Sequence, residues 1–328
     1  MLKIGLWSDS LNFPSLPLMK LSAYYKNKYK NCTVKLIDSF FERFDIVYCS
    51  KVFNLPAITK IPQLPQSLLA NEIYMGGTGF AIFDTNNKEH YIKENDLPHD
   101  IEHTYPDYGL YPELTKDTAF GFLTRGCPNA CGFCVVSKKE GLKSVHSYYL
   151  SEFWHGQPNI KLMDANLLAC DNAEELLMEL IMSNANIDFT QGLDARLVDE
   201  HTAGLLSKLK IKMLHFAFDI MQHESRIIRG LRLFSKHSTT NSRNRKVYIL
   251  TNYNTTHAED WYRVKKVIEL GYRPDIRIYR KGTHPQFLTD LARWANLSRL
   301  YRSCSFEDYI PRKDGKRCKD MYSDILAS

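Results

Sequence analysis

Hydrophobic residues recur in two alternating patterns from residue 118 onward. Short apolar runs, typical of buried strands, fall at 119–124, 159–163, 187–190, 212–218, 246–250 and 275–279. Segments with apolar residues at helical spacing lie between them and predict helices at about 173–183, 200–208, 224–234 and 258–270. This alternation is typical of a parallel barrel or sheet, because each helix returns the chain to the start of the next parallel strand.

The N-terminal segment shows a shorter version of the same pattern. Apolar runs predict strands at 3–7, 33–38, 45–49 and 72–75, and a helix at 17–28. This order predicts a small, Rossmann-like α/β domain over residues 1–83. The last of these strands runs into Gly76-Gly-Thr-Gly79, which is either a tight turn or a place where the backbone approaches a ligand closely.

Two further segments complete the predicted organisation. Residues 84–117 are polar and rich in turn-forming residues, so we expect a linker, packed through Tyr105, Tyr108, Leu110 and Tyr111. Residues 118–284 form the predicted barrel domain, with six strands. Residues 285–328 form a C-terminal extension, which has a helix at 285–295 and a basic tail.

Composition narrows the class of protein. The chain has 328 residues, a formal net charge of +6 and eight cysteines. Apolar runs fall short of the ~20 residues needed to span a bilayer, and the N-terminus does not resemble a signal peptide. We therefore expect a soluble, cytoplasmic protein without a membrane partner, whose cysteines serve metal binding rather than disulfides. The mild positive charge is compatible with an anionic partner such as a nucleic acid.

Candidate chemistry concentrates in the turn after the strand at 119–124. Cys127, Cys131 and Cys134 lie there at the spacing C-x3-C-x2-C, with Phe133 directly before the last cysteine. Structural zinc normally takes four protein ligands, whereas an iron–sulfur cluster held by three cysteines has one iron open for another ligand. The competing interpretation is a non-catalytic metal module in which a fourth ligand, not identified from the spacing, completes a zinc site.

This cysteine loop resembles the signature of the radical S-adenosylmethionine (SAM) superfamily, C-x3-C-x-aromatic-C after the first barrel strand. The resemblance implies a partial (β/α)6 barrel and a [4Fe–4S] cluster on Cys127, Cys131 and Cys134, with SAM on the open iron. It also implies a flavodoxin- or ferredoxin-type electron donor, reductive cleavage of SAM to a 5′-deoxyadenosyl radical, and removal of a hydrogen atom from a substrate. The N-terminal layout resembles the branch with a cobalamin-binding-like domain. That branch's Asp-x-His-x-x-Gly motif is absent from this sequence, so cobalamin is not expected.

The predicted strand ends carry polar residues that suit SAM, because functional side chains of parallel barrels gather at the carboxyl ends of strands. Asp164 or Asn166 suits the amino group, although the family often has Gly-Gly-Glu at this point. Arg196 suits the carboxylate, and the other polar residues suit the ribose hydroxyls. Each residue is alternatively a strand-end cap. With Phe133, the candidate cofactor-binding residues are Asp164, Asn166, Gln191, Asp194, Arg196 and Asn252.

The substrate is less defined than the cofactor, because no residue identifies the acceptor of the radical. The region between the fourth and fifth predicted strands is the most basic in the chain, through Arg226, Arg229, Arg232, Lys236, Arg243, Arg245 and Lys246. These side chains are either a solvated helix face or contacts to a phosphate backbone. A nucleobase or nucleic acid is therefore the first expectation, with a peptide or small metabolite as the alternative.

The remaining cysteines give weaker signals. Cys304 and Cys318 in the C-terminal extension are candidate ligands of a second cluster, but two thiols are too few without other ligands. Cys32, Cys49 and Cys170 lie on or beside apolar runs and are expected in the core.

Overall fold

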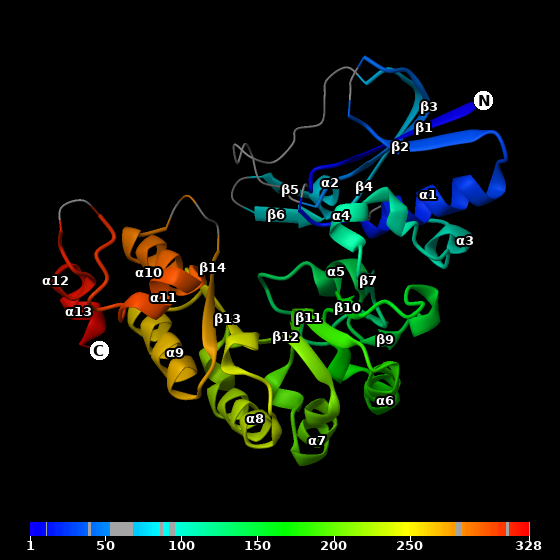
Figure 1. Ribbon diagram of the computed structural model, residues 1–328. Coiled ribbons are helices and arrows are strands. Elements are labelled where there is room, and N and C mark those ends of the chain that lie inside the picture. The colour runs from blue at the N-terminus through cyan, green and yellow to red at the C-terminus, as the bar shows by residue number, and fades with distance from the viewer. Residues whose placement is uncertain are drawn as a thin grey trace. The chain divides into compact units, whose positions relative to one another are not determined.

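The structure is a computed structural model that describes residues 1–10, 12–38, 41–52, 68–85, 88–91, 96–279, 282, 284–312 and 315–327. It is a mixed α/β protein with parallel sheets, as predicted (Figure 1). The chain divides into two compact units. Unit 1 comprises Met1–Leu142 and Ser147–Lys161, and unit 2 comprises Lys143–His146 and Leu162–Ser328. The boundary falls within strand β10 (Asn159–Leu162).

Unit 1 begins with a four-stranded parallel sheet whose order is β2-β1-β3-β4. Its strands are β1 (Leu2–Ser8), β2 (Cys32–Leu36), β3 (Phe44–Ser50) and β4 (Ala70–Gly76). Helix α1 (Leu16–Lys28) connects β1 to β2. All five elements were predicted from the hydrophobic pattern, and each is confirmed with small differences at its ends.

Both faces of this sheet are apolar, which explains why β1 reads as a continuous hydrophobic run. Successive side chains of a strand point to opposite faces. Ile4 and Leu6 pack against Leu18 and Leu21 of α1. Trp7 instead belongs to a second cluster, with Phe44, Val47 and Cys49. A parallel strand covered on both sides has no polar face to show in the sequence.

The Gly76-Gly-Thr-Gly79 segment is a close approach of the chain to itself. Gly77 has φ of +97°, and a Cβ there would lie 2.4 Å from the Lys51 carbonyl oxygen. The Gly79 amide donates a hydrogen bond of 2.8 Å to the same oxygen. The glycines therefore make room for the backbone of Lys51, which supports the tight-turn interpretation. Helix α2 (Thr78–Ala81) and an antiparallel hairpin, β5 (Ile82–Thr85) and β6 (Lys88–Tyr91), follow.

The segment that continues to residue 117 is packed within unit 1. It contains α3 (His99–Glu102), a 3-10 turn (Tyr108–Leu110) and α4 (Pro112–Thr115). The Tyr108 hydroxyl donates to the Phe153 carbonyl at 2.6 Å. The Asp107 carboxylate accepts from both Ser22 and Lys26 of α1 at 2.6 Å. These bonds attach the segment to α1 and to the chain beyond the cysteine loop.

Unit 2 carries the strand–helix alternation expected from the sequence. Its parallel strands lie in the order β14-β13-β12-β11. They are β11 (Asn186–Leu193), β12 (Lys210–Ala217), β13 (Arg245–Thr251) and β14 (Arg273–Ile278). The helices between and before them are α6 (Ala173–Ser183), α7 (Glu200–Lys208), α8 (Glu224–His237) and α9 (His257–Glu269). All of these elements were predicted.

The C-terminal extension is helical. Helix α10 (Gln286–Asn296) matches the predicted helix, and shorter helices follow, α11 (Ser298–Ser303), α12 (Cys318–Met321) and α13 (Ser323–Leu326). Among the described residues, no helix is both long enough and apolar enough to span a membrane.

The sheet of unit 2 has two different faces. Val247 and Ile249 of β13 are fully buried, and Phe216 of β12 contacts Phe234 of α8 with ring centroids 5.4 Å apart. This apolar face packs against the helices (Figure 1). The residues that alternate with these, such as His215 and Tyr248, point to the other face. That other face carries the polar groups described below.

Candidate functional site

The predicted cysteine loop follows β7 (Thr118–Gly121) in unit 1. Ala119 and Phe120 of this strand are buried, and so are Leu123 and Thr124 just after it. The chain then passes through β8 (Thr124–Arg125) and leaves the core. The loop thus starts from a fixed, buried strand, which is the position the sequence predicted for it.

Hydrogen bonds close this loop at its two ends. The Cys127 amide donates to the Gly141 carbonyl at 3.2 Å, and the Gly126 amide donates to the Glu140 carboxylate at 3.0 Å. Glu140 ends the short helix α5 (Val136–Glu140), which follows the last cysteine of the loop. The two ends of the segment 126–141 are therefore tied together.

The three cysteines of this loop differ in environment from the buried cysteines of the chain, such as Cys49. Cys127, Cys131 and Cys134 are half-buried, as is Phe133. The Cys134 amide donates to the Cys131 carbonyl at 2.9 Å, which makes a tight turn between them. In contrast, burial raises the pKa of Cys49 to about 12, so that thiol stays protonated in the core.

The structure describes all eight cysteines, and each is a thiol rather than half of a disulfide. Within the described ranges, no group of three or more His, Cys, Asp or Glu side chains is arranged to hold a metal ion. The chemistry of the donor set in the loop nevertheless fits an iron–sulfur cluster, because three soft sulfur ligands come from one short, closed segment. Cys318, proposed with Cys304 for a second cluster, is fully buried, and burial raises its pKa to about 12.

Three of the candidate SAM contacts meet within unit 2. The Asn166 side-chain amide donates to Asp194 Oδ2 at 3.4 Å, and Asp194 in turn pairs with Arg196. Asp164 and Asn166 are 4% and 2% exposed, although both are polar. The Ser144 hydroxyl donates to the Asn166 carbonyl at 2.8 Å and holds that backbone in place. The segments after β10 and β11 are thereby linked through their side chains.

Arg196 forms an ion pair with the neighbouring Asp194 carboxylate. Its Nε lies 2.8 Å from Asp194 Oδ1, and its Nη2 lies 2.6 Å from Asp194 Oδ2. Asp194 Oδ1 also accepts from the Arg196 amide at 3.1 Å and so caps the 3-10 turn Ala195–Leu197. Two of the five N–H donors of the guanidinium are used by this pair. The pair sets the orientation of Arg196.

A glycine in α8, which the hydrophobic pattern does not reveal as important, lets this turn pack against the helix. A Cβ on Gly230 would lie 1.7 Å from the Ala195 carbonyl oxygen, so only glycine fits there. The turn that carries Asp194 and Arg196 therefore packs directly on the backbone of α8. The sequence does show a glycine in the middle of an otherwise amphipathic helix. A glycine at such a position usually allows another part of the chain to pack closely.

Asn252 and Gln191 are placed differently. Asn252 has φ of +62°, and its side-chain amide donates to the Tyr279 carbonyl at 2.9 Å. Its nitrogen thus connects the ends of β13 and β14. Gln191 is exposed on β11. Side-chain hydrogen bonds join Asn166, Asp194 and Arg196. Among the described residues, no side-chain hydrogen bond joins Asn252 to these three.

A polar row on the second face of the unit 2 sheet was missed from the sequence. The His215 ring stacks on Tyr248, with centroids 4.6 Å apart and planes 3° from parallel. The Arg277 guanidinium lies 4.8 Å from the same tyrosine ring, and it pairs with Asp275 at 3.0 Å. The Tyr248 hydroxyl donates to the Thr190 carbonyl at 2.8 Å. The row therefore crosses β11, β12, β13 and β14.

Burial changes the acid–base behaviour of this row. Desolvation lowers the pKa of His215, whose Nδ1 donates to the Phe189 carbonyl at 3.0 Å, so the neutral imidazole is favoured. Desolvation also raises the pKa of Tyr248 to about 12. The sequence signal was polar residues at every second position of a strand, Lys246 with Tyr248 and Asp275 with Arg277.

A second missed feature is a fully buried arginine in α9. Arg263 is 0% exposed and forms an ion pair with Asp260. It also donates to the Phe218 carbonyl at 2.8 Å and to the Leu250 carbonyl at 2.9 Å. Arg263 thus ties α9 to the ends of β12 and β13. Asp219, which follows β12, accepts from the Leu250 amide at 2.8 Å, and burial raises its pKa to about 6.

Comparison with protein-family models finds no match, and comparison with curated proteins finds none either. The chemistry of the site is therefore inferred from this chain's own residues. Those residues form two sets, the cysteine loop of unit 1 and the strand-end and polar-row residues of unit 2.

Proposed function

We propose that this protein is a radical SAM enzyme built on a partial (β/α)6 barrel. One observation carries the proposal, namely the Cys-x3-Cys-x-Phe-Cys loop directly after β7 in a chain that continues as alternating strands and helices. The closure of the loop by Gly126, Cys127, Glu140 and Gly141 supports it, because a ligand-bearing loop must keep its donors together.

In this proposal Cys127, Cys131 and Cys134 hold a [4Fe–4S] cluster. When bound, the cluster supplies the electron that cleaves SAM reductively to a 5′-deoxyadenosyl radical. Phe133, which is half-buried and directly precedes Cys134 in the sequence, would limit access of water to the loop. An external flavodoxin- or ferredoxin-type donor provides the electron.

The residues after β10 and β11 would bind SAM. Asp164 or Asn166 would accept from the amino group, and their burial favours a strong hydrogen bond. Arg196 would meet the carboxylate, with Asp194 as the positioning residue that orients the guanidinium. Gln191 and Asn252 would contact the ribose. The Asn252 side-chain nitrogen donates to the Tyr279 carbonyl, so the side-chain oxygen of Asn252 would accept from a ribose hydroxyl.

The polar row of His215, Tyr248 and Arg277 would face the substrate. In a parallel barrel, the face away from the helices is the interior, which is normally filled by bulky apolar side chains, so a row of polar groups there is a candidate for substrate binding. A neutral imidazole, a protonated phenol and a guanidinium suit hydrogen bonding to a nucleobase. We accordingly propose a nucleobase or nucleic acid as the substrate, with a peptide or small metabolite as the alternative class.

The test is anaerobic reconstitution with iron and sulfide, followed by reduction in the presence of SAM. We expect brown protein with about four irons and acid-labile sulfide per chain, and formation of 5′-deoxyadenosine. Cys131→Ala should lose both the iron and the product while keeping its melting temperature, because the loop cysteine is outside the core. Cys32→Ala is the matched control, since it also removes a half-buried thiol and should change neither the iron content nor the product. Colourless wild-type protein with stoichiometric zinc would instead identify a non-catalytic module.

A further inference from the structure

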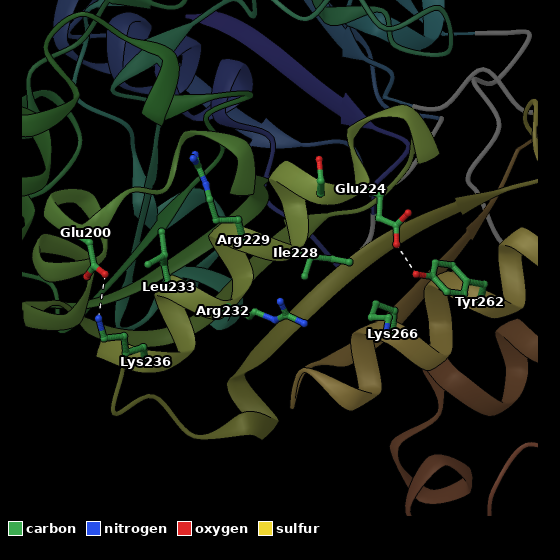
Figure 2. Close-up of a pocket in the computed structure, with 10 residues that line it drawn as sticks. Glu200, Glu224, Ile228, Arg229, Arg232, Leu233, Lys236, Tyr262 and Lys266 are labelled. Carbon is green, nitrogen blue, oxygen red and sulfur yellow. Dashed lines mark hydrogen bonds and ion pairs between the residues drawn. The ribbon is translucent and has the colours of Figure 1, made fainter.

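Unit 2 has a groove between α8 and α9 that is separate from the residues assigned above (Figure 2). Its volume is about 530 Å³. Ile228 and Leu233 of α8 and Tyr262 of α9 provide apolar surface, and all three are half-buried. Basic side chains from both helices surround them, as Figure 2 shows for Arg229, Arg232, Lys236 and Lys266.

The four cations differ in whether a carboxylate pairs with them. Lys236 pairs with Glu200 at 2.9 Å, and Lys266 pairs with Glu269 at 2.6 Å. Arg229 and Arg232 are exposed, and in the part of the chain that the structure describes neither has a carboxylate within ion-pair distance. Their charge is therefore available to an external anion at the edge of an apolar hollow.

The spacing of the cations forms a row. Arg229, Arg232 and Lys236 lie on one face of α8, three and then four residues apart, so the helical rise separates them by about 4.5 and about 6 Å along the axis. Arg245 and Lys246, further along the chain, do not join the row. Arg245 is placed over the ring of Tyr272, and Lys246 pairs with Asp275. A row of cations suits a ligand that carries several anionic groups in succession, rather than a ligand with one anionic group.

The aromatic ring adds a second kind of contact. The Tyr262 hydroxyl donates to Glu224, which fixes the ring beside Ile228 (Figure 2). A positively charged track together with an aromatic side chain is how proteins bind single-stranded nucleic acid, with phosphates on the cations and a base stacked on the ring. An acidic peptide would satisfy the cations, but it would not need the ring.

We propose that this groove binds single-stranded nucleic acid, with successive phosphates on Arg229 and Arg232 and a base against Tyr262. The groove would then hold the strand while the chemistry takes place elsewhere in the protein. The proposal names a partner for the chain and does not depend on the cysteine loop, so it can be tested on protein without a cluster.

The experiment measures fluorescence anisotropy of a labelled single-stranded RNA of about 12 nucleotides, over about 50 to 300 mM KCl. Arg229→Gln/Arg232→Gln should weaken binding at low salt by at least tenfold. It should also reduce the slope of log K against log salt by about 1.4, because each lost phosphate contact on a single strand contributes about 0.7. Lys208→Gln/Arg299→Gln is the matched control, since it removes two exposed cations outside the groove and should leave the slope unchanged.

The ring is tested separately. Tyr262→Ala should weaken RNA binding about tenfold, whereas Tyr262→Phe should retain most of the affinity, because stacking needs the ring and not the hydroxyl. If the groove variant and its charge-matched control lose the same RNA affinity, the loss is due to net charge alone, and the proposal is overturned. Equal affinity for a duplex of the same sequence, with no effect of Tyr262→Ala, would overturn it as well.

Discussion

The Arg196 guanidinium and the Asp194 carboxylate form a two-point ion pair, with contacts of 2.8 and 2.6 Å, at the turn that follows β11. The two side chains are 20% and 11% exposed, so water screens the pair only in part. The pair fixes the turn. We propose that it also orients the guanidinium toward the SAM carboxylate, and measurements on one variant can separate the two roles.

Replacing Arg196 by alanine should weaken SAM binding by about a hundredfold, because a charge-assisted, partly desolvated contact is lost. The iron content should not change, since the three thiolates are elsewhere in the chain. SAM affinity, iron content and melting temperature are measured on the same preparation. Unchanged SAM affinity with a lowered melting temperature would limit Arg196 to fixing the turn. Arg196→Lys is a useful comparison, because it keeps the charge but loses the two-point geometry.

Replacing Gly230 by alanine should strongly destabilise unit 2. The added Cβ would lie 1.7 Å from the Ala195 carbonyl oxygen, so the turn with Asp194 and Arg196 must move away from α8. We expect a loss of about 1–3 kcal/mol or more, as for overpacked sites, and weaker SAM binding with it. Gly204→Ala in α7 is the control, since a Cβ there meets nothing within 4 Å. Its melting temperature should stay the same or rise, because alanine favours the helix.

Asp219 should make stability depend on pH in the acid range. Its pKa in the folded protein is about 6, whereas the ordinary value is 3.8, so the folded state binds the proton more tightly than the unfolded state. Stability therefore falls as pH rises from about 4 to about 6, by up to about 3 kcal/mol. Asp219→Asn keeps an acceptor for the Leu250 amide but carries no charge. The variant should match the wild type near pH 4 and be more stable at pH 7.

The measurement for Asp219 is the difference in melting temperature between the two proteins at several pH values. A difference that does not change with pH would show that the carboxylate has the same pKa in the folded and unfolded states. In that case Arg263, beside it in the structure, would compensate the charge as fully as burial opposes it.

The N-terminal sheet should not bind hydroxocobalamin tightly. The histidine motif of the cobalamin-binding branch is absent from the sequence, and Gly77 makes room for the backbone of Lys51 rather than for a ligand. Titration followed by visible absorbance should show no spectral change at micromolar protein. Stoichiometric binding would contradict this and would favour methyl transfer as the reaction.

The sequence by itself determined the succession of strands and helices. The predicted helix at 200–208 coincides with α7, and the one at 173–183 coincides with α6, because helical periodicity is a property of neighbouring residues. The cysteine spacing is local in the same way, and it alone leads to the proposed chemistry. Hydrophobic burial then requires these elements to pack as parallel sheets under helices.

Only the tertiary structure decided which side chains meet. The stacking of His215 on Tyr248 depends on the register of two strands, and the burial of Arg263 depends on carbonyl groups from two strand ends. The role of Gly230 depends on a turn 35 residues earlier in the chain. The contrast between Arg229 and Lys236 depends on Glu200, which comes from another helix. Such contacts join residues far apart in sequence, and hydrophobic periodicity carries no information about them.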